Sequence, residues 1–470
     1  MGKRALNDEV AKRLLKGLDL VCFAAIGFCT GIIAAQNPDA ATPDLVCFLT
    51  LTLTFLCIFV LRGLGLYEAR AQARLFSSIA KSLVVMAVVG IAGGMLAPLM
   101  SLQMGSLWYK GWLGAGAVYI TLSRLATWFV TRHAAPKGQY RQRIAVVGGG
   151  KAAEDAITIL EHSPGLDIEI IGLFDDRYDS RSPASIRRHK KLGKIADLST
   201  YARAHAVDLV IVAIPISAEQ RLLQILKRIW ELPVDIRVSG QAAQLRLSQR
   251  AYSYLGDLPL LPVFDRPLSH WNEFLKDVLD RLIALVTLVL LTPVLAGVAL
   301  AVRLESKGPV LFKQKRFGFN NELIEVLKFR SMYTDKSDAT AAKLVTKDDP
   351  RVTKVGRFIR KTSLDELPQL VNVLKGQLSL VGPRPHATQA KAAGGLYDEV
   401  VEGYFARHKV KPGITGWAQI NGWRGETDTL EKIEQRVKHD LEYIDRWSLG
   451  LDLYILMKTP FALLKSENAY

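Results

Sequence analysis

Two adjacent carboxylates, Asp365 and Glu366, are the residues of this chain whose types and spacing most clearly allow chemistry. Neighbouring carboxylates repel each other, so the pair costs free energy unless a metal ion or a phosphate surrounded by cations needs both. Mg²⁺ takes such oxygen ligands and shares its coordination shell with substrate phosphates. The ordinary alternative is a solvated pair in the first turn of a helix. The pair begins a short predicted helix and follows a basic segment, residues 354–361, that we interpret as strand-like.

Further residues that could bind phosphate lie in three motifs of the same half of the chain. They are Lys328 and Arg330 in KFRSM, Arg384 in VGPRP, and Lys411, Pro412 and Gly413 in KPGITGW. Arginine offers a planar fork that matches phosphate oxygens. The proline–glycine turn after Lys411 would expose backbone amides to a phosphate or a uracil. The alternative for each arginine is a surface ion pair.

These motifs occur together, in this order, in the bacterial polyprenyl-phosphate hexose-1-phosphate transferases, and residues 266–470 resemble these monotopic phosphoglycosyl transferases. The resemblance implies transfer of a sugar-1-phosphate from a UDP-sugar to undecaprenyl phosphate, with release of UMP. Such a reaction would be the first membrane step of exopolysaccharide, capsule or O-antigen synthesis. Glucose-1-phosphate is the group that we expect, and galactose-1-phosphate is the alternative.

The resemblance also implies roles for the candidate residues. Asp365 would attack the phosphorus that carries the sugar and form a covalent phosphosugar-aspartyl enzyme. Glu366 would bind Mg²⁺, alone or with Asp365, although the residues alone would allow the two roles to be exchanged. Lys328, Arg330 and Arg384 would clamp the donor phosphates. Lys313 and Arg316 would bind the lipid phosphate or anionic headgroups.

The composition predicts membrane segments between charged soluble domains. The chain has 470 residues, of which 49% are hydrophobic and 23% charged, and its net charge is +16. This length predicts several domains, and this charge suits anionic lipids or phosphorylated substrates. Nucleic acid is not an expected partner, because the basic residues cluster beside apolar segments. All four cysteines lie in apolar stretches, so we expect neither a disulfide framework nor a zinc site.

Four apolar segments in the first domain, residues 1–135, are each close to the roughly 20 residues that cross a bilayer. They are residues 18–35, 45–61, 79–100 and 107–130. Lysine and arginine precede the first segment, lie between the second and third, and follow the fourth, whereas the other two connecting loops lack them. The positive-inside rule therefore predicts that both ends of this four-helix bundle are cytoplasmic. We therefore expect a multi-pass protein of the bacterial inner membrane. No buried charged relay is evident, so we expect the bundle to anchor the chain and to form homodimer contacts rather than to transport a solute.

The second domain, residues 140–262, alternates strand and helix patterns, which predicts a small doubly wound, Rossmann-like sheet. Gly148, Gly150 and Ala153 fit a dinucleotide fingerprint after the first strand. The alternative is that these glycines only let the strand turn tightly into a helix. Residues 181–191 read as a solvated loop, and residues 255–269 read as the linker to the next domain.

A fifth apolar segment, residues 282–302, lies near the start of the third domain, residues 266–470. Pro293 lies near its middle, and proline removes a helical hydrogen bond. Both flanks are basic, so a spanning helix would place one cluster on the wrong side of the membrane. We predict a re-entrant helix at about 279–303, embedded among membrane lipids and broken at Pro293, as the resemblance also implies. A kinked spanning helix is the alternative.

Two other functional classes compete with the transferase. The glycine fingerprint would suit a membrane-anchored, NAD-dependent nucleotide-sugar epimerase or dehydratase, but the Tyr-x-x-x-Lys pair of such enzymes occurs only at Tyr454 and Lys458, outside the Rossmann-like domain. A non-catalytic, nucleotide-sensing membrane scaffold is the second alternative, and the intact carboxylate pair argues against it. The expected fold class is thus a transmembrane four-helix bundle, a Rossmann-like α/β domain and a monotopic α/β catalytic domain.

Overall fold

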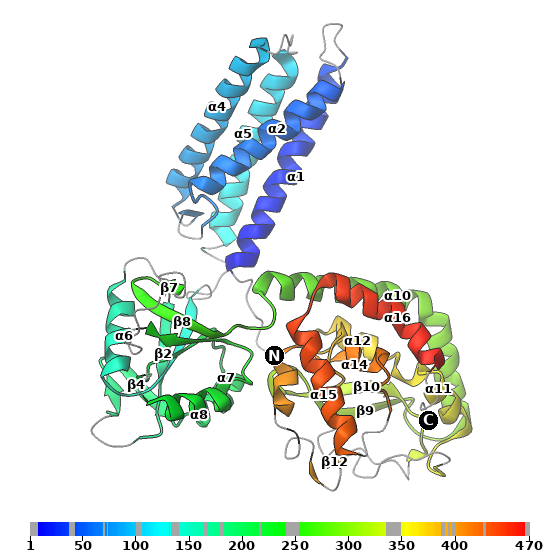
Figure 1. Cartoon of the computed structure of the whole chain (residues 1–470). Coiled ribbons are helices and arrows are strands. Elements are labelled where there is room, and N and C mark those ends of the chain that lie inside the picture. Colours follow the sequence, from blue (N-terminus) through cyan, green and yellow to red (C-terminus); the bar gives the residue numbers. More distant parts are fainter. Residues whose placement is uncertain are drawn as a thin grey trace. The chain divides into compact units, whose positions relative to one another are not determined.

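The structure is a computed structural model of the whole chain (Figure 1). It describes residues 8–36, 43–68, 71–72, 74–99, 106–130, 132, 141–163, 168–177, 182–215, 218–240, 253–334, 349–386, 391–392, 395–396, 401, 403–425 and 429–465. The chain separates into two compact units, Met1–Arg141 and Gln142–Tyr470. Each unit has its own hydrophobic core.

Long helices form the first unit. They are α1 (Asp8–Ala34), α2 (Pro43–Gly63), α4 (Leu75–Leu99) and α5 (Ser106–Phe129). In the described residues, α1, α2, α4 and one helix of the second unit are long and apolar enough to cross a membrane, which indicates a membrane protein, whereas α5 does not reach that apolarity. The loops 37–42 and 100–105, on which the predicted orientation depends, lie outside the described residues.

A buried ion pair, which the sequence analysis did not predict, joins two helices of this unit. Arg124 of α5 donates to Asp19 of α1 at 2.9 Å, and both side chains are fully buried. The hydroxyls of Tyr67 and Tyr119 each donate to an Asp19 oxygen at 2.9 Å. Ser82 of α4 accepts from Arg124 Nε at 3.4 Å. Several segments of the bundle therefore depend on a single carboxylate.

The second unit begins with a mostly parallel sheet that has eight strands among the described residues, in the order β3-β4-β2-β1-β5-β6-β8-β7. The parallel centre consists of β2 (Ile168–Phe174), β1 (Gln142–Val147), β5 (Leu209–Val212) and β6 (Asp235–Ser239). Helix α6 (Lys151–His162) packs on one face. Helices α7 (Asp197–Ala204) and α8 (Glu219–Ile229) pack on the other. Helices on both faces confirm the doubly wound centre that the sequence predicts.

Both edges of the sheet differ from the prediction. Residues 181–191, expected to be a solvated loop, contribute β3 (Ser185–Ile186) and part of β4 (His189–Gly193), which pairs with β2. The expected linker contains β8 (Leu258–Phe264), which pairs antiparallel with β6 and with β7 (Ser253–Leu255). Lysine and proline conceal a strand pattern in the sequence, but strands near a sheet edge tolerate both residues.

A single helix, α10 (His270–Glu305), leads from the sheet into the domain that carries the carboxylate pair. Both of its ends are fixed to that domain. Near the start, Lys276 Nζ donates to Asp452 Oδ2 at 2.6 Å in a buried ion pair. At the end, the Glu305 carboxylate accepts the backbone N–H of Lys354 at 2.7 Å. The helix therefore begins and ends against the same domain.

The middle of α10 exposes an apolar surface. Its exposed side chains include Leu282, Leu285, Val286, Val289, Leu290 and Val294. Helical geometry continues through Pro293, and Figure 1 shows a bend along the helix. Proline removes one backbone hydrogen bond, which favours such a bend without ending the helix. The structure therefore has one bent helix in place of the predicted helix–break–helix.

The remaining elements of this domain follow α10. They are β9 (Leu311–Phe317), η4 (Phe319–Asn321), β10 (Leu323–Phe329), α11 (Lys354–Lys361), η6 (Leu364–Glu366), α12 (Gln369–Leu374), β11 (Ser379–Val381), β12 (Lys391–Ala392), β13 (Gly395–Leu396), η7 (Tyr404–Lys409), β14 (Gly413–Thr415), α14 (Trp417–Ile420), α15 (Leu430–Asp445) and α16 (Leu449–Lys465), where η marks a 3-10 helix. β9 and β10 form an antiparallel hairpin, and β11 pairs in parallel with β14.

The basic segment before the carboxylate pair is a helix, α11, so the strand-like interpretation of residues 354–361 is wrong. The Thr353 hydroxyl caps this helix by accepting the Gly356 N–H at 2.8 Å, which is a strong start signal for a helix. Gly356 and Ile359, three residues apart, are the buried positions of α11. That spacing is helical, but eight residues contain too few turns to show the period clearly.

We expect Asp19→Asn to destabilise the first unit by about 3–5 kcal/mol, because the substitution leaves the Arg124 charge buried without a countercharge. Glu9→Gln is the matched control, since Glu9 pairs with Arg13 on the exposed side of the same helix and such a pair contributes only about 0–1 kcal/mol. Thermal unfolding of the detergent-purified protein, followed by circular dichroism, measures both effects. Equal losses in the two variants would contradict a structural role for the buried pair.

Candidate active site

The carboxylate pair lies on the 3-10 helix η6, directly after α11. Ser363, the residue before η6, has a left-handed backbone conformation with φ of 60°. This conformation is uncommon for a residue other than glycine. Arg424 Nη2 donates to the Ser363 hydroxyl at 2.6 Å, and this contact helps to hold the turn that presents the pair.

Glu366 is neutralised by cations from two separate segments. Lys328 Nζ, at the end of β10, donates to Glu366 Oε1 at 2.8 Å. Arg384, after β11, donates from Nη2 to Oε1 at 2.5 Å and from Nη1 to Oε2 at 3.2 Å. Burial alone would raise the pKa of Glu366, but Arg384 and Lys328 outweigh it and hold this pKa well below its usual range. Glu366 is therefore a fixed anion.

Asp365 has a different environment. Its residue surface is only 9% exposed, yet its carboxylate accepts no hydrogen bond from a residue that the structure describes. Burial is the largest cause that raises its pKa to about 6; Lys328 opposes the shift and Glu366 adds to it. Near pH 7 the Asp365 carboxylate is thus mostly ionised, and its oxygens are available to an electrophile.

Arg316 and Arg424 also lie beside the pair. Arg316, which we expected to bind the lipid phosphate or anionic headgroups, donates to the backbone oxygen of Pro385 and, at 2.8 Å, to Gln314 Oε1. Burial and the neighbouring Arg384 lower the pKa of Arg316 to about 10. The same two causes lower the pKa of Arg424. Sequence analysis missed Arg424, whose only signal was its place shortly after the KPGITGW motif.

Arg330 does not reach the carboxylate pair. Its guanidinium donates to the backbone oxygens of Ser306 at 2.7 Å and Lys307 at 2.8 Å, just after α10, and to that of Val302 at 3.3 Å. The last carbonyls of a helix lack partners within the helix. Arg330 therefore fixes the end of α10, and the geometry does not support the expected phosphate contact.

Lys411 and Lys313 also form ion pairs away from the carboxylate pair. Lys411 pairs with Asp277 of α10. Lys313 lies 3.5 Å from Glu325 across the β9–β10 hairpin, where both side chains are exposed. The structure thus brings Lys328 and Arg384 to the pair, adds Arg316 and Arg424, and leaves Lys313, Arg330 and Lys411 elsewhere.

The VGPRP and KPGITGW motifs cross with their backbones in direct contact. Gly382 N–H donates to Thr415 O at 2.9 Å, and Gly413 N–H donates to Pro383 O at 3.0 Å. A Cβ on Gly382 would lie 2.5 Å from Lys411 O, which leaves no room for a side chain. The crossing positions the residue after Pro383, which is Arg384. The Gly413 amide is used in this crossing and is not exposed as predicted.

The glycine loop of the Rossmann-like sheet is filled by its own chain. Gly148 has φ of +120°, and a Cβ on Gly149 would lie 2.8 Å from Asp175 Oδ2. Gly148 and Gly149 are buried, and Gly150 directly precedes α6 without a side-chain cap. A carboxylate beside this loop would repel a phosphate. The candidate residues Gly148, Gly150 and Ala153 therefore form a tight strand-to-helix turn, and nucleotide binding there stays a prediction.

The carboxylate pair is the donor set that fits Mg²⁺. Asp365 has unused acceptor positions, whereas Glu366 already accepts three hydrogen bonds from Lys328 and Arg384. Within the described part of the chain, no three His, Cys, Asp or Glu side chains gather into a metal site. Mg²⁺ usually takes one or two carboxylates and completes its shell with phosphates and water. The residues thus fit an ion held mainly by Asp365, with Glu366 as a second ligand.

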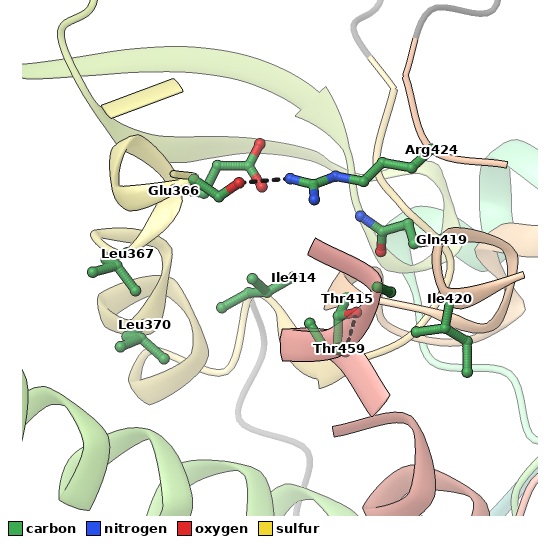
Figure 2. Close-up of a pocket in the computed structure, with 11 residues that line it drawn as sticks. Glu366, Leu367, Leu370, Ile414, Thr415, Gln419, Ile420, Arg424 and Thr459 are labelled. Atoms are coloured by element: carbon green, nitrogen blue, oxygen red, sulfur yellow. Dashed lines mark hydrogen bonds between the residues drawn. The ribbon is translucent and has the colours of Figure 1, made fainter. Parts of the chain in front are cut away.

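An apolar pocket opens beside Glu366. Figure 2 shows Glu366, Gln419 and Arg424 along one side of it. Leucine, isoleucine and alanine side chains supply most of the remaining lining, namely Leu367, Leu370, Ile414, Ile420 and Ala462. The pocket therefore combines a charged side, adjacent to the carboxylate pair, with an apolar interior.

Two family models match the chain. The bacterial sugar transferase family matches residues 271–466, which include the carboxylate pair and the cations around it. A CoA-binding domain family matches residues 62–240, which extend from the end of α2 through the centre of the sheet. The first match places the active-site candidates within one family domain.

Curated relatives align over most of the chain. A UDP-glucose:undecaprenyl-phosphate glucose-1-phosphate transferase of Escherichia coli (strain K12) is 40% identical over 71% of this chain and 70% of its own. A protein of the same name from Xanthomonas campestris pv. campestris is 33% identical over 78% of this chain and 77% of its own. A UDP-galactose-lipid carrier transferase of Erwinia amylovora is 31% identical over 71% and 70%. Because these alignments cover most of both partners, the chain belongs to the bacterial sugar transferase family of phosphoglycosyl transferases.

Proposed function

We propose that this chain transfers glucose-1-phosphate from UDP-glucose to undecaprenyl phosphate and releases UMP. The observation that carries the proposal is the contrast between Asp365, which accepts no hydrogen bond from the described residues, and Glu366, which Lys328 and Arg384 hold. Two relatives named for glucose-1-phosphate transfer support the choice of sugar. The relative named for UDP-galactose keeps galactose-1-phosphate as the alternative.

In the first step, an Asp365 oxygen attacks the phosphorus that carries the sugar. The bond from this phosphorus to the UMP oxygen breaks, and UMP leaves with the electron pair. Phosphoryl transfer depends mainly on positioning and on stabilisation of negative charge. Arg384 and Lys328 supply positive charge next to Asp365, and the rigid crossing of the two glycine motifs keeps Arg384 in place.

In the second step, an oxygen of undecaprenyl phosphate attacks the same phosphorus, and the Asp365 carboxylate leaves and is regenerated. Arg316 and Arg424 lie where they could attract the two phosphates that meet at this point. Mg²⁺ held by Asp365 and Glu366 would supply neutralising charge to the donor diphosphate. The bonds formed and broken in the two steps balance without a further reactant.

We also propose that α10 enters and leaves the membrane on one face, the cytoplasmic face of the bacterial inner membrane. The support is that both ends of α10 contact the same domain, through Lys276 and Glu305, while its middle exposes apolar side chains. A spanning helix would carry these ends to opposite sides of the bilayer. UDP-sugars are cytoplasmic, so the active site would face them. The homodimer stays a prediction.

Lipid-dependent UMP release tests the function. With UDP-glucose, Mg²⁺ and undecaprenyl phosphate, we expect release by the purified protein and a loss of at least about 10³-fold in Asp365→Asn, because the nucleophile is removed. Glu325→Gln, on the exposed hairpin face, is the matched control and should keep full activity. No UMP from glucose, galactose or N-acetylated donors would refute the proposal and favour the nucleotide-sensing scaffold.

The first step should slow as the pH falls through about 6. The pKa of Asp365 is raised to about 6, so protonation below that pH removes the attacking lone pair. A single-turnover burst of UMP without the lipid, measured from pH 5 to 8, isolates this step. Arg384→Met should move the midpoint to higher pH, since Arg384 lowers the pKa of Asp365. A midpoint near pH 4, the value of an ordinary aspartate, would argue against a buried nucleophile.

Metal removal should abolish turnover if the carboxylate pair holds Mg²⁺. We expect EDTA to stop UMP release and added Mg²⁺ to restore it. Glu366→Gln should raise the Mg²⁺ concentration for half-maximal activity about tenfold or more, as expected when a supporting ligand is lost. Full turnover in EDTA would show that Lys328, Arg384 and their neighbours neutralise the diphosphate without a metal.

A further inference from the structure

We propose that the apolar pocket beside Glu366 binds the isoprene units of the acceptor that lie nearest to its phosphate. This inference rests on the proposed function, because it gives the hydrocarbon of the polyprenyl phosphate a defined place during the second step. It adds a subsite for the acceptor to the carboxylate pair and its cations.

The lining of the pocket offers few hydrogen bonds. Leu370, Ile414 and Ile420 come from α12, β14 and α14, three separate elements that meet around the cavity. Thr415 and Thr459 also line it, but their hydroxyls bond to each other at 2.8 Å. Thr459 in addition donates to Ile455 O at 2.7 Å. The polar atoms of both threonines are thus satisfied within the protein.

This chemistry selects the acceptor rather than the donor. A UDP-sugar presents uracil, ribose, phosphate and hexose groups, all of which lose free energy when buried without hydrogen-bond partners. The polyprenyl chain is the one extended apolar group in the reaction, and it gains free energy from burial against leucine and isoleucine. A ligand with a charged head and a hydrocarbon tail matches a pocket whose charged side lies next to Glu366.

The charged side of the pocket can bind the head of such a ligand. Arg424 brings its guanidinium to this side (Figure 2). Gln419 also lines it, and its Oε1 is buried without a hydrogen-bond partner among the described residues. A buried amide without a partner costs free energy unless a ligand or water completes it. The acceptor phosphate would therefore lie between Asp365 and Arg424, with its hydrocarbon directed into the apolar interior.

One helix of the pocket wall also carries an exposed apolar surface. Its wall includes Ala462 of α16, and the outer side of α16 exposes Leu453, Met457 and Phe461. Helix α16 shares a hydrophobic cluster with the first half of α10, and Figure 1 shows the two helices side by side. Apolar side chains of α16 therefore lie near one wall of the pocket, on the helix that packs against α10.

Ala462→Phe tests the inference by filling the pocket. We expect the KM for undecaprenyl phosphate to rise at least about tenfold, because the added ring takes space from one or more isoprene units. Lipid-independent formation of UMP and the KM for UDP-glucose should stay within about twofold of wild type, the scatter expected for an exposed change. Ala204→Phe, which adds the same ring at an exposed position of α7 in the Rossmann-like domain, is the matched control.

The outcomes separate the two proposals. Wild-type protein that releases no UMP would refute the proposed function itself. A higher KM for UDP-glucose in Ala462→Phe would assign the pocket to the donor, and unchanged constants in a folded variant would leave it without a substrate; both results overturn the inference.

If Ala462→Phe does not fold, photo-crosslinking of wild type with a diazirine-bearing prenyl phosphate decides. Labelling of residues 414–420 or 459–462 supports the inference, and labelling confined to α10 overturns it.

Discussion

The ion pairs of Glu366 with Lys328 and Arg384 are the interactions on which the rest of the active site depends. Burying charges is costly unless geometry and hydrogen bonds compensate, and here both Glu366 oxygens accept from cations. Because Lys328 and Arg384 donate to Glu366, the oxygens of Asp365 stay available to a substrate. Two adjacent carboxylates thus have different pKa shifts and different tasks, which follow from their neighbours rather than from residue type. The pair tolerates its mutual repulsion because one member is neutralised inside the protein and the other is left for a phosphate.

This arrangement requires that Arg384 stay in place, and it is held from two directions. The crossing of Gly382 and Gly413 fixes the backbone just before it. Arg407 Nη2 donates to Arg384 O at 2.6 Å, and Arg407 is itself fully buried against Asp440 at 2.5 Å. The VGPRP and KPGITGW motifs are therefore one structural unit, in which glycines permit the backbone contact that makes an arginine rigid. Rigid donors stabilise developing charge more effectively than mobile ones, because they need no reorganisation.

The sequence predicted the central strands, the carboxylate pair and two of its cations, because hydrophobic period and local motif order carry that information. It could not predict where each basic side chain would end. Arg330 belongs to a motif beside Lys328, yet it fixes the end of α10, since the tertiary path of α10 decides which atoms are within reach. Asp19 and Arg124 are 105 residues apart, and each is an isolated charge in an apolar run. Their pairing follows from helix packing, which no local pattern encodes.

A membrane transferase of this kind must bring a water-soluble diphosphate and a lipid phosphate to one phosphorus atom. Here the carboxylate pair lies between a set of buried cations and an apolar pocket, and the pocket wall belongs to a cluster shared by α10 and α16. Because both ends of α10 are tied to the same domain, the helix and the pocket wall form one packed body. With α10 inserted from one side of the membrane, as proposed above, this body would hold Asp365 at a fixed distance from the bilayer.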